Sequence, residues 1–177
     1  MVPLQTNNLA SLTDALETLG GELRQVFESI DWETEKLDSR RWGRLRQKMT
    51  EFQSLSVLVE ARRDRLEAEA AQTLKPWLDR LIHGVAIRAL QAEARLAEIQ
   101  HNMREIPLFG RELFTQALHR LDRLMEQVQS TSPAPEHDQM VIERARHERQ
   151  DLLELIKRSP DIPDFTALPK RPQRLAA

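Results

Sequence analysis

The chain has 177 residues, of which 40% are apolar, 31% are charged and 5% are aromatic, and its formal net charge at pH 7 is −2. This length is enough for one domain with appendages, and the near-neutral charge gives no whole-molecule argument for binding nucleic acid or a membrane. The absence of cysteine excludes disulfides, thiolate metal ligands and cysteine nucleophiles. The sequence shows neither a secretory signal nor an apolar run of about 18 residues, so we expect a cytoplasmic protein that does not contact a membrane.

Apolar residues recur at alternating intervals of three and four, a spacing that suits helices packed lengthwise against other helices. The first series predicts a helix from about Asn8 to Leu37. The pair Gly20–Gly21 is its weak point, because glycine disfavours a helix interior. The series consists of Leu9, Leu12, Leu16, Leu19, Leu23, Val26, Ile30 and Leu37.

A second helix is predicted from about Arg40 to Gln72. Ser56 and Arg63 interrupt its apolar series, so we expect its second half to pack less well than its first. The series consists of Trp42, Leu45, Met49, Phe52, Ser56, Val59, Arg63, Leu66 and Ala70.

Thr73 and Pro76 then resemble a helix cap and a first-turn proline, so we expect a third helix to begin there and to run from about Leu74 to Glu105. The alternative is one continuous helix with a kink at Pro76. The third series is unbroken, and we expect Leu96 and Ile99 to lie in the core. Its members are Leu78, Ile82, Val85, Ala89, Ala92, Leu96, Ile99, Met103 and Ile106.

Two shorter helices are predicted after a break at 106–110, where proline and glycine interrupt the pattern. One runs from about Arg111 to Gln129 and the other from about Asp138 to Arg158. Between them, 130–135 combines small hydroxyl residues with two prolines. From Ser159 onward, four prolines predict an extended or disordered tail.

These elements predict an all-α fold, an elongated antiparallel helical bundle or coiled coil of three long helices plus two shorter helices, with a disordered C-terminal tail. We divide the chain into a helical bundle at 1–129, a linker at 130–137, an accessory helix at 138–158 and a Pro-rich basic tail at 159–177. Because few contacts should cross such a linker, we expect the accessory helix to separate from the bundle.

The strongest local signal is a basic stretch at the start of the second helix, with five positive charges, one tryptophan and no acidic residue within 39–48. Such charges bind phosphates, and an indole can stack on bases. The alternative, which we favour, is pairing with Asp31, Glu33, Glu35 and Asp38, because basic residues at a helix N-terminus oppose the helix dipole. The stretch comprises Arg40, Arg41, Trp42, Arg44, Arg46 and Lys48.

The tail carries Ile162, Phe165 and Leu168 at three-residue intervals. This spacing predicts a short linear motif that docks on a partner. The alternative is a terminus that lies on its own bundle or contacts nothing. We therefore group Phe165 and Leu168 with the basic stretch as candidate contacts for a partner or for nucleic acid.

No motif for catalysis, for a cofactor or for a metal rises above chance. Glu98 and His101 match the Glu-x-x-His pattern of di-iron bundles, which needs two such pairs, and the chain has one. The acidic residues alternate with Arg and Lys along helix faces, so Glu93 and its like are expected to be solvated. We predict no enzyme activity, no cofactor, no metal site and no small-molecule substrate.

The sequence therefore predicts a non-enzymatic helical module for protein–protein interaction, an adaptor, scaffold or assembly factor. It would bind a protein partner or form a homo-oligomer through its apolar seams. The alternative is a nucleic-acid-associated helical protein that uses residues 40–48 and the basic tail.

Overall fold

The protein is described by a computed structural model, which covers residues 3–30, 39–102, 105–107, 109–133 and 135–160. Within these ranges the chain forms helices and no strand, so the predicted all-α class is confirmed. The five helices are α1 (Pro3–Glu28), α2 (Ser39–Arg63), α3 (Ala68–His101), α4 (Gly110–Thr131) and α5 (Pro135–Arg158). No helix in this part of the chain combines the length and the apolar character needed to cross a membrane.

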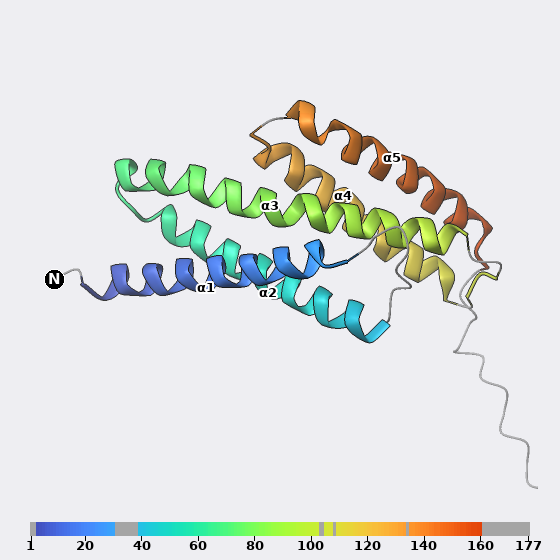
Figure 1. Ribbon diagram of the computed structural model, residues 1–177, viewed down its shortest axis with the longest axis horizontal. Coiled ribbons are helices and arrows are strands. Elements are labelled where there is room, and N and C mark those ends of the chain that lie inside the picture. The colour runs from blue at the N-terminus through green and yellow to red at the C-terminus, as the bar shows by residue number, and fades with distance from the viewer. Residues whose placement is uncertain (1–2, 31–38, 103–104, 108, 134, 161–177) are drawn as a thin grey trace, which may run out of the picture.

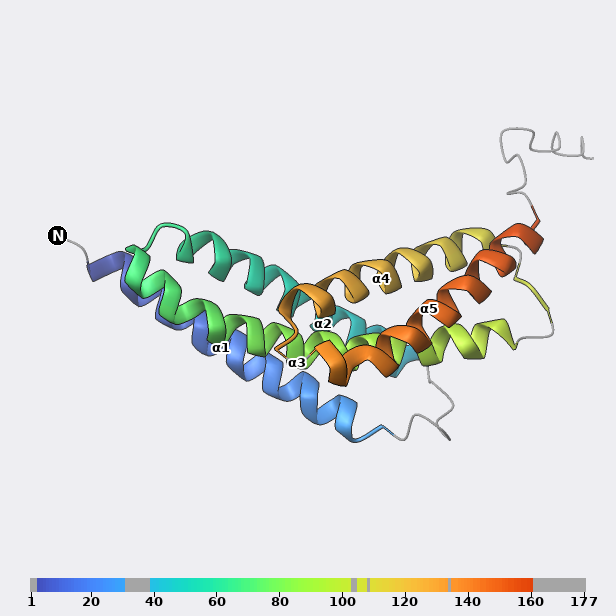
Figure 2. The same ribbon diagram turned by 90° about the horizontal axis from the view of Figure 1, so that it is seen from above.

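The longest helix, α3, has 34 residues and is shared by two groups of helices. Its first half packs with α1 and α2, and its second half packs with α4 and α5 (Figure 1). Each helix runs antiparallel to the one before it (Figure 2). We call the two resulting apolar clusters the N-terminal core and the C-terminal core.

The N-terminal core confirms part of the predicted seam of the first helix, since Leu16, Leu23 and Ile30 are buried. Four further members are half-buried and pack against this core, namely Leu9, Leu12, Leu19 and Val26, and Leu37 lies outside the described residues. α1 continues through Gly20–Gly21 without a break. Gly20 is needed for a close approach, because a Cβ atom there would lie 2.9 Å from Leu81 Cδ1 and 3.1 Å from Phe52 Cε2. The glycine that weakens α1 in isolation therefore lets α1 come close to its neighbours.

The connection between α2 and α3 differs from the prediction. α2 ends at Arg63, a turn follows, and α3 begins at Ala68, so Pro76 lies inside a helix that has already formed. The turn is closed by the Leu66 amide, which donates to the Arg63 carbonyl at 2.9 Å. Pro76 and Gln72 are both exposed, so the proline lies on the solvent side of α3, where an interrupted helical hydrogen bond is tolerated best.

The C-terminal core corrects the position predicted for the last helix. The connection before α5 is only 132–134, because α4 extends to Thr131 and α5 begins at Pro135. α5 packs against both α3 and α4, and it is a core element rather than an accessory one. Its buried apolar side chains are Ile142, Ala145, Leu152 and Leu155.

The seam of α3 also changes face along the helix. The predicted series is buried from Leu78 to Ala92, but Leu96 and Ile99 are only half-buried, which corrects our expectation for both. The C-terminal core instead uses a different face of α3, because α4 and α5 dock on that side. Its apolar members are Ala86, Leu90, Ala94 and Ala97.

Polar contacts fix the first turn of α5. Asp138 is buried, and its Oδ2 lies 2.7 Å from His83 Nε2 on α3 and accepts a hydrogen bond from the Ser132 hydroxyl. Burial raises the pKa of Asp138, but the hydrogen bonds from Ser132 and His83 outweigh it and hold the pKa below its ordinary value. The ionised carboxylate therefore helps to hold α5 on α3.

Candidate interaction groove between α2 and α4

A buried ion cluster joins the two groups of helices. Glu93 on α3 is 2% exposed, and its two carboxylate oxygens accept hydrogen bonds from Nε and Nη2 of Arg46 on α2, each at 3.2 Å. Arg120 on α4 places its Nε 3.3 Å from the same carboxylate. A bidentate, charge-assisted pair of this kind fixes both distance and orientation.

Glu93 is buried because it lies on a face of α3 that packs against other helices. Our expectation that it is solvated was therefore wrong. It lies between Leu90 and Ala97 at helical spacing, on the face that packs in the C-terminal core. Burying a carboxylate among apolar neighbours is costly unless cations pair with it. The two arginines meet this requirement from helices on either side.

Two guanidinium groups around one carboxylate leave an excess of positive charge. Among the described residues, Arg120 Nη2 is buried and has no hydrogen-bond partner. Burial lowers the pKa of Arg120, the charge of Arg46 lowers it further, and Glu93 opposes both. A guanidinium stays charged at neutral pH despite such effects, so Arg120 adds to the positive charge of the cluster.

The cluster forms the wall of a hollow between α2 and α4, with a volume of about 260 Å³. Three arginines and the single carboxylate of Glu93 line it, together with polar and apolar side chains. The arginines are Arg46, Arg120 and Arg123, and the other lining residues are Met49, Thr50, Gln53, Leu124 and Gln127. A second hollow of about 500 Å³ continues along α2 and shares Thr50 and Gln53 with the first. The two hollows therefore adjoin at Thr50 and Gln53, and the second is an open surface lined by α2 alone.

The second hollow has an apolar end. Val57 and Leu58 line it, and the two residues are 58% and 50% exposed, which places them among the few large apolar residues at the surface of the described part of the chain. We define the α2–α4 groove by seven residues, with arginines at one end and aliphatic side chains at the other. They are Arg46, Thr50, Gln53, Val57 and Leu58 from α2, and Arg120 and Arg123 from α4.

The basic stretch predicted from the sequence is divided by the fold. Trp42 is buried, and the Arg46 guanidinium lies over its ring, 5.3 Å from the centroid. Lys48 Nζ is 2.9 Å from Glu22 Oε2 on α1. The remaining three residues, Arg40, Arg41 and Arg44, are exposed.

Several predicted partners and contacts lie outside the described residues. These are the acidic residues expected to neutralise the basic stretch and the two apolar residues of the tail. They comprise Asp31, Glu33, Glu35, Asp38, Phe165 and Leu168. Among the described residues, Arg46 and Lys48 instead pair with Glu93 and Glu22, neither of which we had named as a partner.

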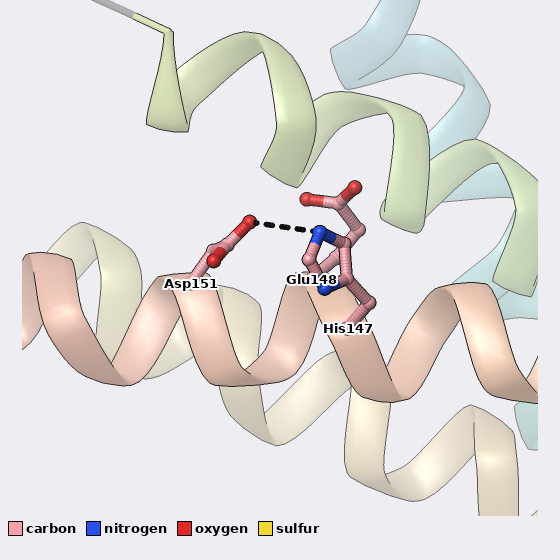
Figure 3. Close-up of side chains that lie close together, drawn as sticks. All are labelled: His147, Glu148 and Asp151. Atoms are coloured by element: carbon pink, nitrogen blue, oxygen red, sulfur yellow. Dashed lines mark ion pairs between the residues drawn. The ribbon is translucent and has the colours of Figure 1, made fainter.

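α5 carries a second group of polar side chains that the sequence analysis missed. His147, Glu148 and Asp151 bring one ligand-type atom each within 4.8 Å of the others (Figure 3). Burial raises the pKa of Glu148, and the nearby charges of Asp151 and Glu98 raise it further. Glu98, which we had considered as half of a metal pattern, accepts hydrogen bonds from Arg95 at 2.6 Å and Arg144 at 2.9 Å.

Comparison of the chain with protein-family models, with curated proteins and with solved structures finds no match. The functional argument therefore depends on the chemistry of the described residues.

Proposed function

We propose that this protein is a non-enzymatic, cytoplasmic helical interaction module that binds an acidic amphipathic helix of a partner protein in the α2–α4 groove. The observation that carries the proposal is a pair of adjoining hollows, one lined by three arginines and the other by two exposed aliphatic side chains. The apolar seams are mostly buried within the two cores, so the groove takes over the binding role that we had given to the seams.

The dimensions of the groove support a helix as the occupant. Arg46 and Leu58 are twelve residues apart on α2, which is about 18 Å at 1.5 Å per residue. A docked helix of about three turns therefore spans both ends of the groove. In this mode of recognition, apolar anchors at i, i+3 or i+4, and i+7 fill the apolar end.

The charges support an acidic occupant. An Asp or Glu one or two turns from the apolar anchors would lie beside Arg120 and Arg123, which line the basic hollow. Val57 and Leu58 are about half exposed, so covering them contributes about 1 kcal/mol each. Contributions of this size favour a small, transient interface whose association is accelerated by charge.

The test is a selection from a displayed library of amphipathic helical peptides, followed by affinity measurements with the purified full-length protein. Enriched peptides should combine apolar anchors at helical spacing with Asp or Glu. Leu58→Ser and Arg123→Gln should each weaken binding by at least about tenfold, because each removes a contact at one end of the groove. Binding should also weaken as salt rises.

The chain offers matched controls on α5. Met140 is an exposed apolar residue and Arg146 an exposed arginine, both away from the groove residues. Met140→Ser and Arg146→Gln should leave affinity within about twofold of wild type, because surface changes away from a contact have small effects. Enrichment of no acidic helix, or unchanged binding in both groove variants, would overturn the proposal. Self-association that Leu58→Ser abolishes would instead assign the groove to a second copy of this chain.

The alternative function, nucleic-acid association, is favoured by the exposure of Arg40, Arg41 and Arg44 at the start of α2. Two observations weaken it. Trp42 is buried and offers no stacking face, and Lys48 pairs with Glu22. The proposal therefore keeps a protein partner in first place.

A further inference from the structure

We propose that His147, Glu148 and Asp151 of α5 form a binding site for a divalent transition-metal ion of the zinc class. The site is separate from the α2–α4 groove and does not depend on the function proposed for it. Two independent observations support it: the convergence of three ligand atoms, and a buried carboxylate oxygen with no partner.

The ligand atoms converge because of their spacing along α5. His147 and Asp151 are four residues apart and share a helix face, and His147 Nε2 lies 3.6 Å from Asp151 Oδ2. Glu148 lies beside the His147 ring and extends toward α3 (Figure 3). Zinc holds nitrogen and oxygen ligands at about 2.0–2.2 Å. Small side-chain rotations therefore suffice to bring the three atoms, now within 4.8 Å, around one ion.

Glu148 supplies the second observation. It is 5% exposed, and its Oε2 is buried without a hydrogen-bond partner among the described residues. A buried carboxylate without a donor is costly, and such groups in native proteins call for an explanation. The positive charges of His147 and Arg144 lower this cost, but Arg144 already donates to Glu98. A bound cation would satisfy the orphaned oxygen.

The donor set selects the class of ion. One imidazole nitrogen and two carboxylate oxygens suit zinc and its neighbours, whereas magnesium and calcium prefer oxygen ligands alone. Three protein ligands also leave a fourth position open. His147 is 74% exposed on its side chain, so an ion can reach the site from solvent.

The test uses full-length protein that has been treated with EDTA and dialysed, to which Zn²⁺ is added alone. Isothermal titration should show binding of one ion per chain, and thermal unfolding should shift to higher temperature as Zn²⁺ rises. His147→Ala and Asp151→Asn should each reduce Zn²⁺ affinity by at least about tenfold. Even residues that only hydrogen-bond to a metal ligand contribute that much to affinity, so loss of a ligand itself should cost no less. His119→Ala, which removes an exposed histidine on α4, should change nothing.

Glu148→Gln separates an ion site from a merely protonated carboxyl group. This variant should unfold at a higher temperature than wild type in the absence of metal, because it removes a buried unpaired charge, and it should bind Zn²⁺ more weakly. Absence of Zn²⁺ binding by the wild-type protein, equal binding by His147→Ala, or equal loss in His119→Ala would overturn the proposal. His147 is largely exposed, so its alanine variant should fold, and circular dichroism checks this.

Discussion

Replacing Glu93 with glutamine should destabilise the protein by about 2–3 kcal/mol. The change keeps the size of the side chain but removes the charge that Arg46 and Arg120 share. Two guanidinium groups would then face a neutral amide in the space between α2 and α4. The cost comes from the unpaired cations rather than from any loss of packing.

The magnitude follows from the burial of the three groups. Removing one partner from a fully buried ion pair costs about 3–5 kcal/mol. Here the side chain of Glu93 is 1% exposed, but those of Arg46 and Arg120 are 30% and 28% exposed, so water solvates part of the charge that is left behind. We therefore expect a cost of about 2–3 kcal/mol, below the range for a fully buried pair. This cost corresponds to a fall in melting temperature of about 5–10 °C for a chain of this size.

Urea unfolding followed by circular dichroism measures the effect. With a slope of about 2–3 kcal/mol per molar urea, the midpoint should fall by about 1 M. Glu22→Gln is the matched control, because Glu22 pairs with Lys48 on the surface and such pairs contribute little. Replacing all three members of the cluster with apolar residues, as Arg46→Met, Glu93→Leu and Arg120→Met, should recover most of the lost stability.

The reasoning would be refuted if the decreases in the free energy of unfolding caused by Glu93→Gln and by Glu22→Gln differed by less than about 0.5 kcal/mol. That result would mean that Glu93 is hydrated in solution. Failure of the triple replacement to recover stability would show instead that the geometry of the cluster, and not its unpaired charge, holds the helices together.

Three other predictions concern the first turn of α5, α5 as a whole and the start of α2. Asp138→Asn should cost about 1–2 kcal/mol at pH 7 and much less at pH 3 in urea titrations, because a carboxylate with a lowered pKa stabilises the fold above about pH 4 and loses that effect as the pH falls. Deleting 136–177 should unfold the C-terminal core, so the circular dichroism signal should fall by more than the helical residues of α5 account for. If residues 1–135 keep all of their helical signal, α5 is an accessory helix, as the sequence analysis predicted. Arg41→Gln combined with Arg44→Gln should leave DNA and RNA binding unchanged in fluorescence anisotropy, whereas micromolar affinity lost in this variant would favour the nucleic-acid function.

The sequence predicts the helices well because periodic spacing and helix breakers are local signals. The break at 106–110 and the buried series from Leu78 to Ala92 both follow from residues close together in the chain. The second buried face of α3 is not visible in this way, because it mixes alanine with Glu93 and Gln100, residues that are equally common on solvated faces. Only the docking of α4 and α5 decides that this face is buried.

The candidate site was only partly predictable for the same reason. The sequence picks out Arg46 as one of a basic group, but its partner Glu93 is 47 residues away, and no local spacing connects them. The cluster on α5 is the opposite case. The positions of His147, Glu148 and Asp151 relative to one another follow from helix geometry, but the burial of Glu148 depends on α3 and cannot be read from α5 alone.

Replacing Glu93 with glutamine should affect the stability of the fold and the binding of a partner in different ways. With Glu93 present, the groove has three arginines and one carboxylate, and the carboxylate holds Arg46 and Arg120 in place. Glu93→Gln raises the positive charge of the groove and releases both guanidinium groups. An acidic peptide selected on the wild-type protein should then associate faster, because long-range attraction grows, and dissociate faster, because its contacts are less preorganised. Stopped-flow measurements at low salt separate the two rates, and a fall in the association rate would contradict the assignment of an acidic helix to the groove.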